Sequence, residues 1–329
     1  MNNNMKRHLL TLYTRTPLHV GSGTSVDVVD LPIMRERITG FPVIPASSLK
    51  GVLLQAAREK WGDPRAKFPP PEARLLFGTA DEDELDASGQ PVKDADGKVK
   101  KLIYAGCVQI MEAKILAFPV RSLAGCFAWL TCPAALERFK RDSAKSVPIP
   151  IFRPEDKDRV TAGAELLVGN QVVLEEYALA PLPDQAGKSA TDVAGKLKEV
   201  CSDTLWQSKL ESRLAVVPDE NFQHFVTTCT EVVARIAINP ETRTVAGTAL
   251  FNQENIPCEA LFYSVLTVLP PRRETGEKDP AKALDAANTT LTDLLPDGKD
   301  PQKQPPILQI GGDETTGHGF CETKREELP

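Results

Sequence analysis

"TPLHVGSGTSVDVVDLPIMRERITGFPVIPASSLKGVL", residues 16–53, joins a loop rich in glycine and proline to a segment with helical periodicity. Pro42 and Pro45 hold the end of the loop extended, and Ser47 or Ser48 is expected to cap the helix that follows. The apolar residues of that helix recur at helical spacing: Leu49, Val52, Leu53, Ala56 and Ala57. This spacing predicts the clearest helix of the chain.

Strands are expected on both sides of this segment. His8–Arg15 (HLLTLYTR) is rich in β-formers and is closed by Thr16-Pro17, which predicts the first strand. The other expected strands are Gly106–Ile110, Ala113–Val120, Phe127–Thr131, Gln171–Leu179, Val232–Ile238 and Ile307–Ile310, with helices near Ala134–Arg141 and Asn221–Cys229. Strands and helices interleave without the regular alternation of a doubly wound sheet, so the predicted fold class is α+β.

A protruding hairpin is expected at about 232–256, where two β-rich arms flank the turn signal Asn239-Pro240-Glu241-Thr242. The whole chain, 1–329, is expected to form a single elaborated domain. Three stretches are expected to be insertions rather than core: 81–101, 182–207 and 271–304. The first opens with five carboxylates in six residues, Asp81–Asp86, which is typical of a solvated surface segment.

Composition restricts the function less than the motifs do. The net charge of −6 argues against a simple nucleic-acid binder, but the acidic stretch can be segregated from a basic surface. The seven cysteines form no Cys-x-x-Cys pair and are expected to be reduced, mostly buried thiols. No apolar run is long enough to span a bilayer, and the start MNNNMKRH lacks the apolar stretch of a signal peptide, so a cytoplasmic protein is expected.

Lys50 lies in the first turn of the predicted helix, where the helix dipole disfavours a cation. A bound anion would reverse this preference, because main-chain N–H groups, the hydroxyls of Ser47 and Ser48 and the lysine together make a phosphate site. The alternative is an exposed lysine with a solvated ammonium group.

A glycine-rich stretch, Ile310–Phe320, follows a predicted strand. It lacks the Gly-Lys-Ser/Thr of a P-loop, and its glycines do not fit the dinucleotide fingerprint. It is therefore either a place where main chain comes close to a ligand or a tight turn.

Four blocks, in order along the chain, carry a specific resemblance: residues 16–53, quoted above, then "FPVRSLAGCFAWLTCP" from Phe118, "ARIAINPETRTV" from Ala234 and "LQIGGDETTGHGF" from Leu308. Together they resemble the RAMP superfamily, and within it the repeated backbone subunit, the fourth, of type III-B CRISPR effector (Cmr) complexes. The resemblance implies a ferredoxin-like (RRM-type) core with a glycine-rich loop, long insertions and a projecting β-hairpin called the thumb.

The resemblance also implies partners and an activity. Copies of such a subunit stack head to tail along a guide CRISPR RNA beside other type III-B subunits, and heterologous contacts of this kind generate an open helical filament. Each thumb pushes one base pair out of the guide–target duplex. The implied function is guide-RNA binding with metal-dependent endoribonuclease cleavage of the complementary target RNA at regular intervals. No membrane partner is implied.

Asp30 aligns with the catalytic aspartate of the family. The 2′-OH of the target RNA is available as nucleophile, and Asp30 either helps to hold a divalent metal ion, magnesium or manganese, or assists removal of the hydroxyl proton. The metal role is preferred because a carboxylate is a weak base at neutral pH. His19 is a candidate proton shuttle, and a structural histidine is the alternative.

RNA contacts are expected from three places. Arg35 and Arg37 alternate on an expected extended segment, so both can grip guide phosphates from one side, unless they are simply exposed at a strand edge. Ser48 and Lys50 resemble the guide-contacting helix start of the family. The remaining expected contacts come from the main chain of the glycine-rich loop, at Gly311, Gly312, Thr316 and Gly319.

One departure and two rival readings remain. Family members commonly have a pattern like Tyr-Glu-Glu-Tyr before Ile-Pro, whereas this chain has Asn252-Gln253-Glu254-Asn255, so an accessory catalytic role for that segment is in doubt. The main alternative function is a purely structural guide-RNA-binding subunit with an inert Asp30. A stand-alone nuclease that processes precursor guide RNA is less favoured, because it would need a His/Tyr/Lys set.

Overall fold

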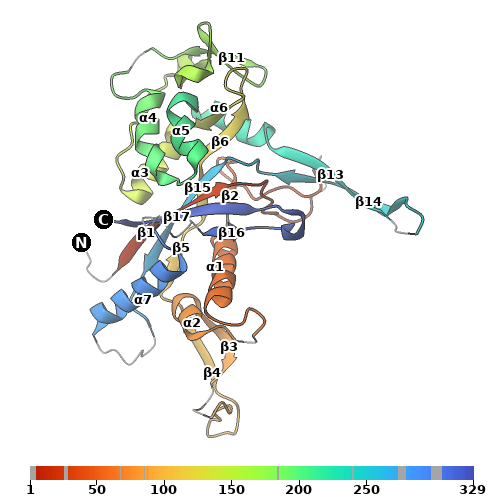
Figure 1. The fold of residues 1–329 in the computed structure, drawn as a ribbon, viewed down its shortest axis with the longest axis vertical. Helices are drawn as coiled ribbons and strands as arrows, with labels where there is room; N and C mark the ends of the chain where they lie inside the picture. The colour runs from red at the N-terminus through yellow and green to blue at the C-terminus, as the bar shows by residue number, and fades with distance from the viewer. Residues whose placement is uncertain are drawn as a thin grey trace.

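A 13-stranded mixed sheet runs through the protein in a computed structural model that describes residues 5–25, 29–66, 68–84, 86, 88–183, 185–238, 241–272, 279–297 and 306–329 (Figure 1). The strand order is β16-β17-β1-β15-β6-β7-β12-β8-β11-β10-β9, with β2 paired to β6 and β5 paired to β15. The bounds are β1 (Lys6–Thr14), β2 (Val43–Ile44), β5 (Val108–Ile110), β6 (Ala113–Arg121), β7 (Phe127–Thr131), β8 (Arg159–Ala162), β9 (Leu167–Val168), β10 (Gln171–Leu174), β11 (Tyr177–Pro181), β12 (Leu214–Val216), β15 (Leu261–Val268), β16 (Ile307–Gln309) and β17 (Phe320–Leu328).

The centre of the sheet is the antiparallel set β17-β1-β15-β6. Helix α1 (Ala46–Trp61) lies between β1 and β6 along the chain, and α7 (Pro280–Leu294) lies between β15 and β17. In the resulting β-α-β-β-α-β series the first and third strands lie side by side in the middle, which is the strand order expected of the ferredoxin-like core that the resemblance implies. The fold class, α+β, is confirmed.

Strand β1 is buried on both faces. Leu10 and Leu12 belong to a core cluster with α1 and α7, while Leu9 and Tyr13 belong to a second cluster on the opposite face. The second cluster is built from α3 (Pro133–Ser143), α4 (Ala190–Leu197) and α5 (Thr204–Arg213), and Figure 1 shows these helices across the strands from α1 and α7. Helices on both faces explain why β1 reads as a continuous β-rich run without polar alternation.

Two local predictions were wrong. Helix α1 begins at Ala46, and its cap residue is Pro45, so neither Ser47 nor Ser48 caps it. The fixed φ of proline, here −57°, already holds the entry to the helix. The strand predicted over Gln171–Leu179 is a hairpin, β10–β11, because the chain reverses at Glu175, whose φ is +48°.

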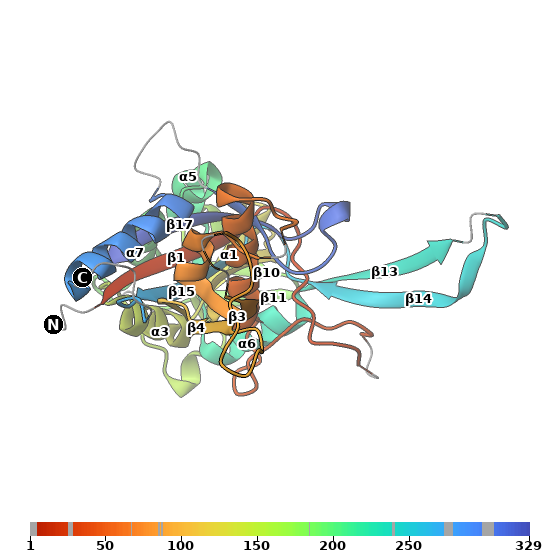
Figure 2. The ribbon, with the colours of Figure 1, turned by 90° about the horizontal axis from the view of Figure 1, so that it is seen from below.

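The predicted hairpin is present as a separate two-stranded sheet, β13 (Glu231–Ile238) and β14 (Val245–Asn255), that projects from the body (Figures 1 and 2). We call it the thumb. Apolar side chains are exposed along it at Val232, Val233, Ile236 and Leu250. Residues 239 and 240 of the predicted turn lie outside the described residues.

The three expected insertions form different structures, and they do not all lie on the surface. The first lies within the hairpin of β3 (Gly78–Asp83) and β4 (Lys101–Ala105), next to α2 (Pro71–Phe77). The second, 182–207, includes α4 and buries Val193 and Trp206 in the second core cluster, so it is not confined to the surface as expected. The third contains α7, with residues 273–278 and 298–304 outside the described part. That these stretches are insertions stays a prediction.

The cysteines agree with the prediction of mostly buried thiols. All seven cysteines are free thiols, and Cys107, Cys132, Cys201 and Cys321 are buried. Burial raises the pKa of Cys107 to about 11, so its thiol stays protonated at neutral pH. Among the described residues there is no helix long and apolar enough to cross a membrane.

Candidate functional site

The loop that carries Asp30 folds back on itself and is held to the body. Met34 N donates to Val20 O at 2.7 Å and Ser22 N donates to Pro32 O at 3.0 Å, which pairs the outgoing and returning arms. Residues 26–28, between the arms, lie outside the described residues. Figure 2 shows the loop beside the base of the thumb.

The two arms cover the outer edge of β14. Leu18 exchanges main-chain hydrogen bonds with Ile256, at 2.8 and 2.9 Å. Leu31 N donates to Asn252 O, and Glu254 N donates to Leu31 O, both at 3.0 Å. An uncovered strand edge leaves N–H and C=O groups unpaired, so the loop and the thumb base stabilise each other.

Asp30 completes this edge with its side chain. Its Oδ2 accepts a hydrogen bond from Asn252 N at 2.7 Å. The carboxylate is partly buried. One carboxylate oxygen is therefore fixed at the junction of loop and thumb, and the charge is held where the thumb leaves the body.

His19 contacts the same strand two residues beyond Asn252, at Glu254. Its Nδ1 lies 2.6 Å from Glu254 O. A carbonyl oxygen only accepts, so Nδ1 carries the proton, and in the neutral ring Nε2 has the free lone pair. The structure thus brings the two predicted catalytic residues, His19 and Asp30, to alternate residues of β14, Glu254 and Asn252.

Arg35 and Arg37 do not share a face. Arg35 is partly buried and donates to Gly40 O, Val226 O and Glu254 Oε1, at 2.9, 3.0 and 2.5 Å. Arg37 is exposed in a turn that is closed by Gly40 N donating to Glu36 O at 2.9 Å, with Gly40 at φ +70°. The expected extended segment with both arginines on one side is therefore wrong, because this turn intervenes.

The glycine-rich loop is shaped by contacts within the protein. A Cβ on Gly311 would lie 2.1 Å from His19 O, and one on Gly319 would lie 2.0 Å from Ile310 O, and both residues have positive φ. These two glycines are required by close packing of main chain. Gly312 and Thr316 are exposed on the same loop and remain available to a ligand.

A link between this loop and the thumb was missed in the sequence. Asp313 Oδ2 lies 3.0 Å from Arg235 Nη2 and accepts from Gln253 Nε2 at 2.5 Å. Asp313 has φ +65°, a conformation that aspartate tolerates better than most residues. An aspartate inside a glycine run was the signal available, but its partners lie on the two thumb strands, far away in sequence.

A carboxylic acid with a shifted pKa lies at the same junction. Glu231 is the first residue of β13, and burial raises its pKa, while the charge of His318 opposes the shift. This residue was not singled out from the sequence, because nothing local marks it as buried.

Ser48 and Lys50 lie in the first two turns of α1. Lys50 is exposed, Ser48 is half-buried, and the helix N-terminus has no side-chain cap. Among the described residues Lys50 makes no ion pair in the structure, so its charge is available to an external anion. This geometry is compatible with a phosphate site at the start of α1, which stays a prediction.

The side chains of the described residues do not form a metal site by themselves. Within the described residues there is no group of three or more His, Cys, Asp or Glu side chains placed to hold an ion. Asp30 offers one carboxylate. A magnesium ion commonly takes one or two carboxylates and completes its shell with phosphate oxygens and water, so Asp30 fits such an ion only together with RNA.

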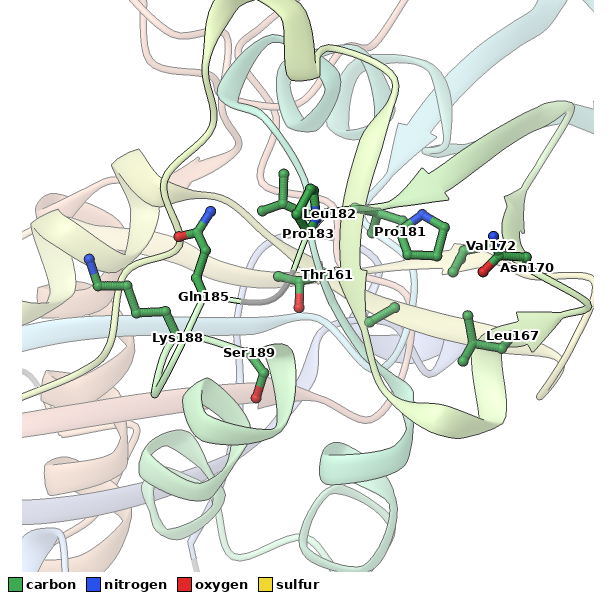
Figure 3. A pocket seen from close by; sticks show the side chains of 12 residues that line it. Thr161, Leu167, Asn170, Val172, Pro181, Leu182, Pro183, Gln185, Lys188 and Ser189 are labelled. Atoms are coloured by element: carbon green, nitrogen blue, oxygen red, sulfur yellow. The ribbon is translucent and has the colours of Figure 1, made fainter.

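The cavity in Figure 3, of about 310 Å³, lies elsewhere. It is lined from β8 to β11 and at the start of α4, with Thr161, Lys188 and Ser189 among its walls. None of the predicted site residues lines it. The candidate site is instead an open junction of loop, thumb base and glycine-rich loop, a form suited to a polymer rather than a small enclosed ligand.

Comparison with known proteins gives consistent matches over the whole chain. The RAMP superfamily model matches residues 11–322. A Pyrococcus furiosus protein named CRISPR system Cmr endoribonuclease Cmr4 is 38% identical, covering 98% of this chain and 97% of its own length. A solved structure of oligomeric Cmr4 from the same organism aligns with a TM-score of 0.67 and 30% identity over 99% of both chains.

A more distant structure supports the fold. A chain of the type III-B Cmr-beta complex bound to cognate target RNA aligns with a TM-score of 0.63 at 18% identity, covering 98% of this chain and 96% of its own. With the match to the superfamily model and the identity to Cmr4 over nearly the full length, this chain belongs to the RAMP superfamily and, within it, to the Cmr4 family.

Proposed function

We propose that this protein is a guide-RNA-binding backbone subunit of a type III-B CRISPR effector complex and an endoribonuclease that cuts complementary target RNA at regular intervals, one site per copy. The observation that carries the proposal is the Asp30 carboxylate held against Asn252 N at the base of the thumb. The name of the 38% identical relative supports the activity. The cytoplasm is its proposed location.

The thumb explains why the site needs an assembled complex. Its exposed apolar residues, such as Val232 and Leu250, suit contact with unstacked bases rather than water. A displaced target nucleotide at the thumb base would bring its 2′-OH and phosphate to Asp30. Base pairing with the guide reads the sequence, while the protein holds backbone and shape.

The proposed cleavage is an internal transfer within the RNA. The 2′-oxygen attacks the adjacent phosphorus, the bond to the 5′-oxygen of the next nucleotide breaks, and the products are a cyclic phosphate and a 5′-hydroxyl. His19 Nε2, with its lone pair free, is suited to accept the 2′-hydroxyl proton, and the leaving oxygen takes up a proton from solvent. Asp30 orients the reacting groups or shares a cation with the phosphate.

A divalent cation, magnesium or manganese, remains part of this proposal. Asp30 would hold it together with RNA oxygens, and its charge would offset the negative charge that develops on the phosphate. Cleavage that is lost in EDTA and restored by magnesium, with target binding measured separately, supports the ion. Undiminished cleavage in EDTA contradicts it.

The test compares wild type with Asp30→Ala in complexes assembled with guide RNA and partner subunits, with magnesium present. Binding that survives while all regular cleavage disappears supports the proposal. If neither protein cuts but both bind, the chain is the purely structural subunit of the alternative reading. If both cut equally, the catalytic group lies elsewhere.

A further inference from the structure

Glu254 is a buried carboxylate at the centre of the thumb base. It is 6% exposed, and its oxygens accept three hydrogen bonds, two from the Asp30 loop and one from the residue that precedes β13. Ile33 N donates to Oε2 at 3.0 Å, while Arg35 Nη2 and Thr230 Oγ1 donate to Oε1 at 2.5 and 2.8 Å. Buried carboxylates need such donors, and all three donors of this group belong to the protein.

Arg35 extends the same connection to a helix. Besides Glu254, its guanidinium donates to Gly40 O and to Val226 O, near the end of α6 (Asp219–Thr228). A guanidinium presents several donors in a fixed fork, which a lysine cannot reproduce. Arg35 thereby joins the Asp30 loop, α6 and β14 at one point.

These contacts fix the segment that carries Asp30. Leu31 makes both of its main-chain hydrogen bonds to β14, and Ile33, two residues on, is bound by the Glu254 carboxylate. Asp30 directly precedes this fixed segment and reaches Asn252 N on the same strand. The position of the Asp30 carboxylate therefore depends on Glu254 and Arg35.

We propose that Glu254 and Arg35 are positioning residues for Asp30, which hold the Asp30 loop on the thumb base without touching RNA. This inference rests on the proposed function, because it assigns how the same site is kept in place. It also gives Arg35 a different role from the phosphate contact expected from the sequence. In this role Glu254 orients the loop and transfers no proton, in keeping with its burial and its three donors within the protein.

The experiment uses complexes assembled on guide RNA with Glu254→Gln, Arg35→Lys and Thr230→Val. In Glu254→Gln the side-chain NH₂ replaces one of the two acceptor oxygens. It must face either Ile33 N–H or the donors of Arg35 and Thr230, and because it cannot accept from them, those hydrogen bonds are lost. The single-turnover cleavage rate is expected to fall about 10- to 100-fold, the scale of a displacement near 1 Å. Target affinity is expected to stay within about twofold, and Thr230→Val is expected to slow cleavage less.

Two further readouts separate positioning from other roles. The pH–rate profile of Glu254→Gln is expected to keep its shape, and a lost or shifted limb overturns the proposal, since Glu254 would then handle a proton. The double variant Glu254→Gln/Arg35→Lys is expected to be no slower than the slower single variant, because the two residues act as one unit. Additive losses overturn the proposal.

The matched control is Asp142→Asn. Asp142 forms an ion pair with Lys114 at 2.9 Å and is about as buried as Glu254, but it packs against β6 and β15 away from the loop. The Asp142→Asn substitution is expected to lower the folding stability of the protein and to leave the cleavage rate unchanged. Equal slowing by Asp142→Asn and Glu254→Gln overturns the proposal, as it indicates general loss of stability.

The outcomes keep the two assignments apart. If Asp30→Ala abolishes cleavage while Glu254→Gln and Arg35→Lys cut at the wild-type rate, the positioning role fails and the proposed function stands. If Asp30→Ala still cuts, the catalytic assignment fails and the inference falls with it. If Glu254→Gln does not assemble, Arg35→Lys and Thr230→Val decide: slowed cleavage supports the proposal, and wild-type rates overturn it.

Discussion

The carboxylate of Asp30 accepts a hydrogen bond from the main-chain N–H of Asn252, 2.7 Å away, across 222 positions of sequence. This bond makes the candidate catalytic group part of a strand edge. Its charge and its hydrogen-bonding role are therefore separable by substitution.

Asp30→Asn is expected to abolish cleavage and preserve the loop. The amide oxygen of asparagine still accepts from Asn252 N–H, while the negative charge is removed. Asp30→Ala removes both and leaves a partly buried N–H without an acceptor, which costs about 1–2 kcal/mol. Urea unfolding and single-turnover cleavage of the two variants check this: equal stability of Asp30→Asn and Asp30→Ala would contradict the structural role of the bond.

Lys50→Ala is expected to weaken assembly on guide RNA and to lower its dependence on salt. Loss of one phosphate contact reduces the slope of log affinity against log salt by about 0.7–0.9 per copy. The control is Lys60→Ala at the other end of α1, where the lysine already pairs with Asp293 at 3.2 Å. Filter binding over a salt series checks this. Identical slopes of log affinity against log salt for the two variants would contradict the phosphate-site hypothesis.

Gly311→Ala and Gly312→Ala are expected to differ sharply. At Gly311, a Cβ meets His19 O at 2.1 Å and φ is +81°, so stability should fall by at least about 2 kcal/mol. At Gly312, the nearest atom to a Cβ is His19 Cδ2 at 3.8 Å, so stability should change by less than about 0.5 kcal/mol.

The same pair tests the glycine-rich loop as an RNA contact. Gly312 is exposed, so an added methyl group that weakens guide binding at unchanged stability supports main-chain approach to RNA. If Gly312→Ala binds guide RNA with unchanged affinity, the hypothesis that the loop contacts RNA is contradicted. The loop would then have only the structural role seen at Gly311.

Folding stability is expected to depend on His8 near neutral pH. Arg325 Nη1 donates to His8 Nδ1 at 2.8 Å, so His8 Nε2 carries the proton toward Asn288 Oδ1, 2.6 Å away on α7. Burial lowers the pKa of His8 from 6.5, and the charge of Arg325 adds to this, although the bond to Asn288 opposes it. The folded protein therefore favours the neutral ring.

The sign of the pH effect follows from this difference. As pH falls below about 6.5, the unfolded chain takes up a proton that folded His8 resists, so the free energy of unfolding decreases. His8→Gln keeps one acceptor and one donor but does not titrate, so its stability should fall less between pH 7.5 and 5.5. Buried acids such as Glu322, whose pKa is raised, act in both proteins and cancel in the comparison. Parallel pH curves for wild type and His8→Gln would contradict the prediction.

Local patterns predicted some elements of this protein but missed β15 and β17, the two strands that flank β1 in the sheet. The apolar spacing after Pro45 predicted α1, and the two arms around residues 239–242 predicted the thumb, because periodicity and turn signals need only neighbouring residues. The cap of α1 and the β10–β11 turn were missed because proline geometry and a single residue with positive φ leave weak traces in composition.

By itself, the sequence determined the α+β class, the RAMP blocks and Asp30 as the candidate catalytic residue, since all three depend on local patterns and motifs. Only the tertiary structure decided that Arg35 binds Glu254, that Arg37 is exposed in a turn and that Asp313 joins the glycine-rich loop to the thumb. The physical reason is that Arg35 and Asp313 find their partners 60 to 219 positions away, on thumb strands that pair only when the chain folds.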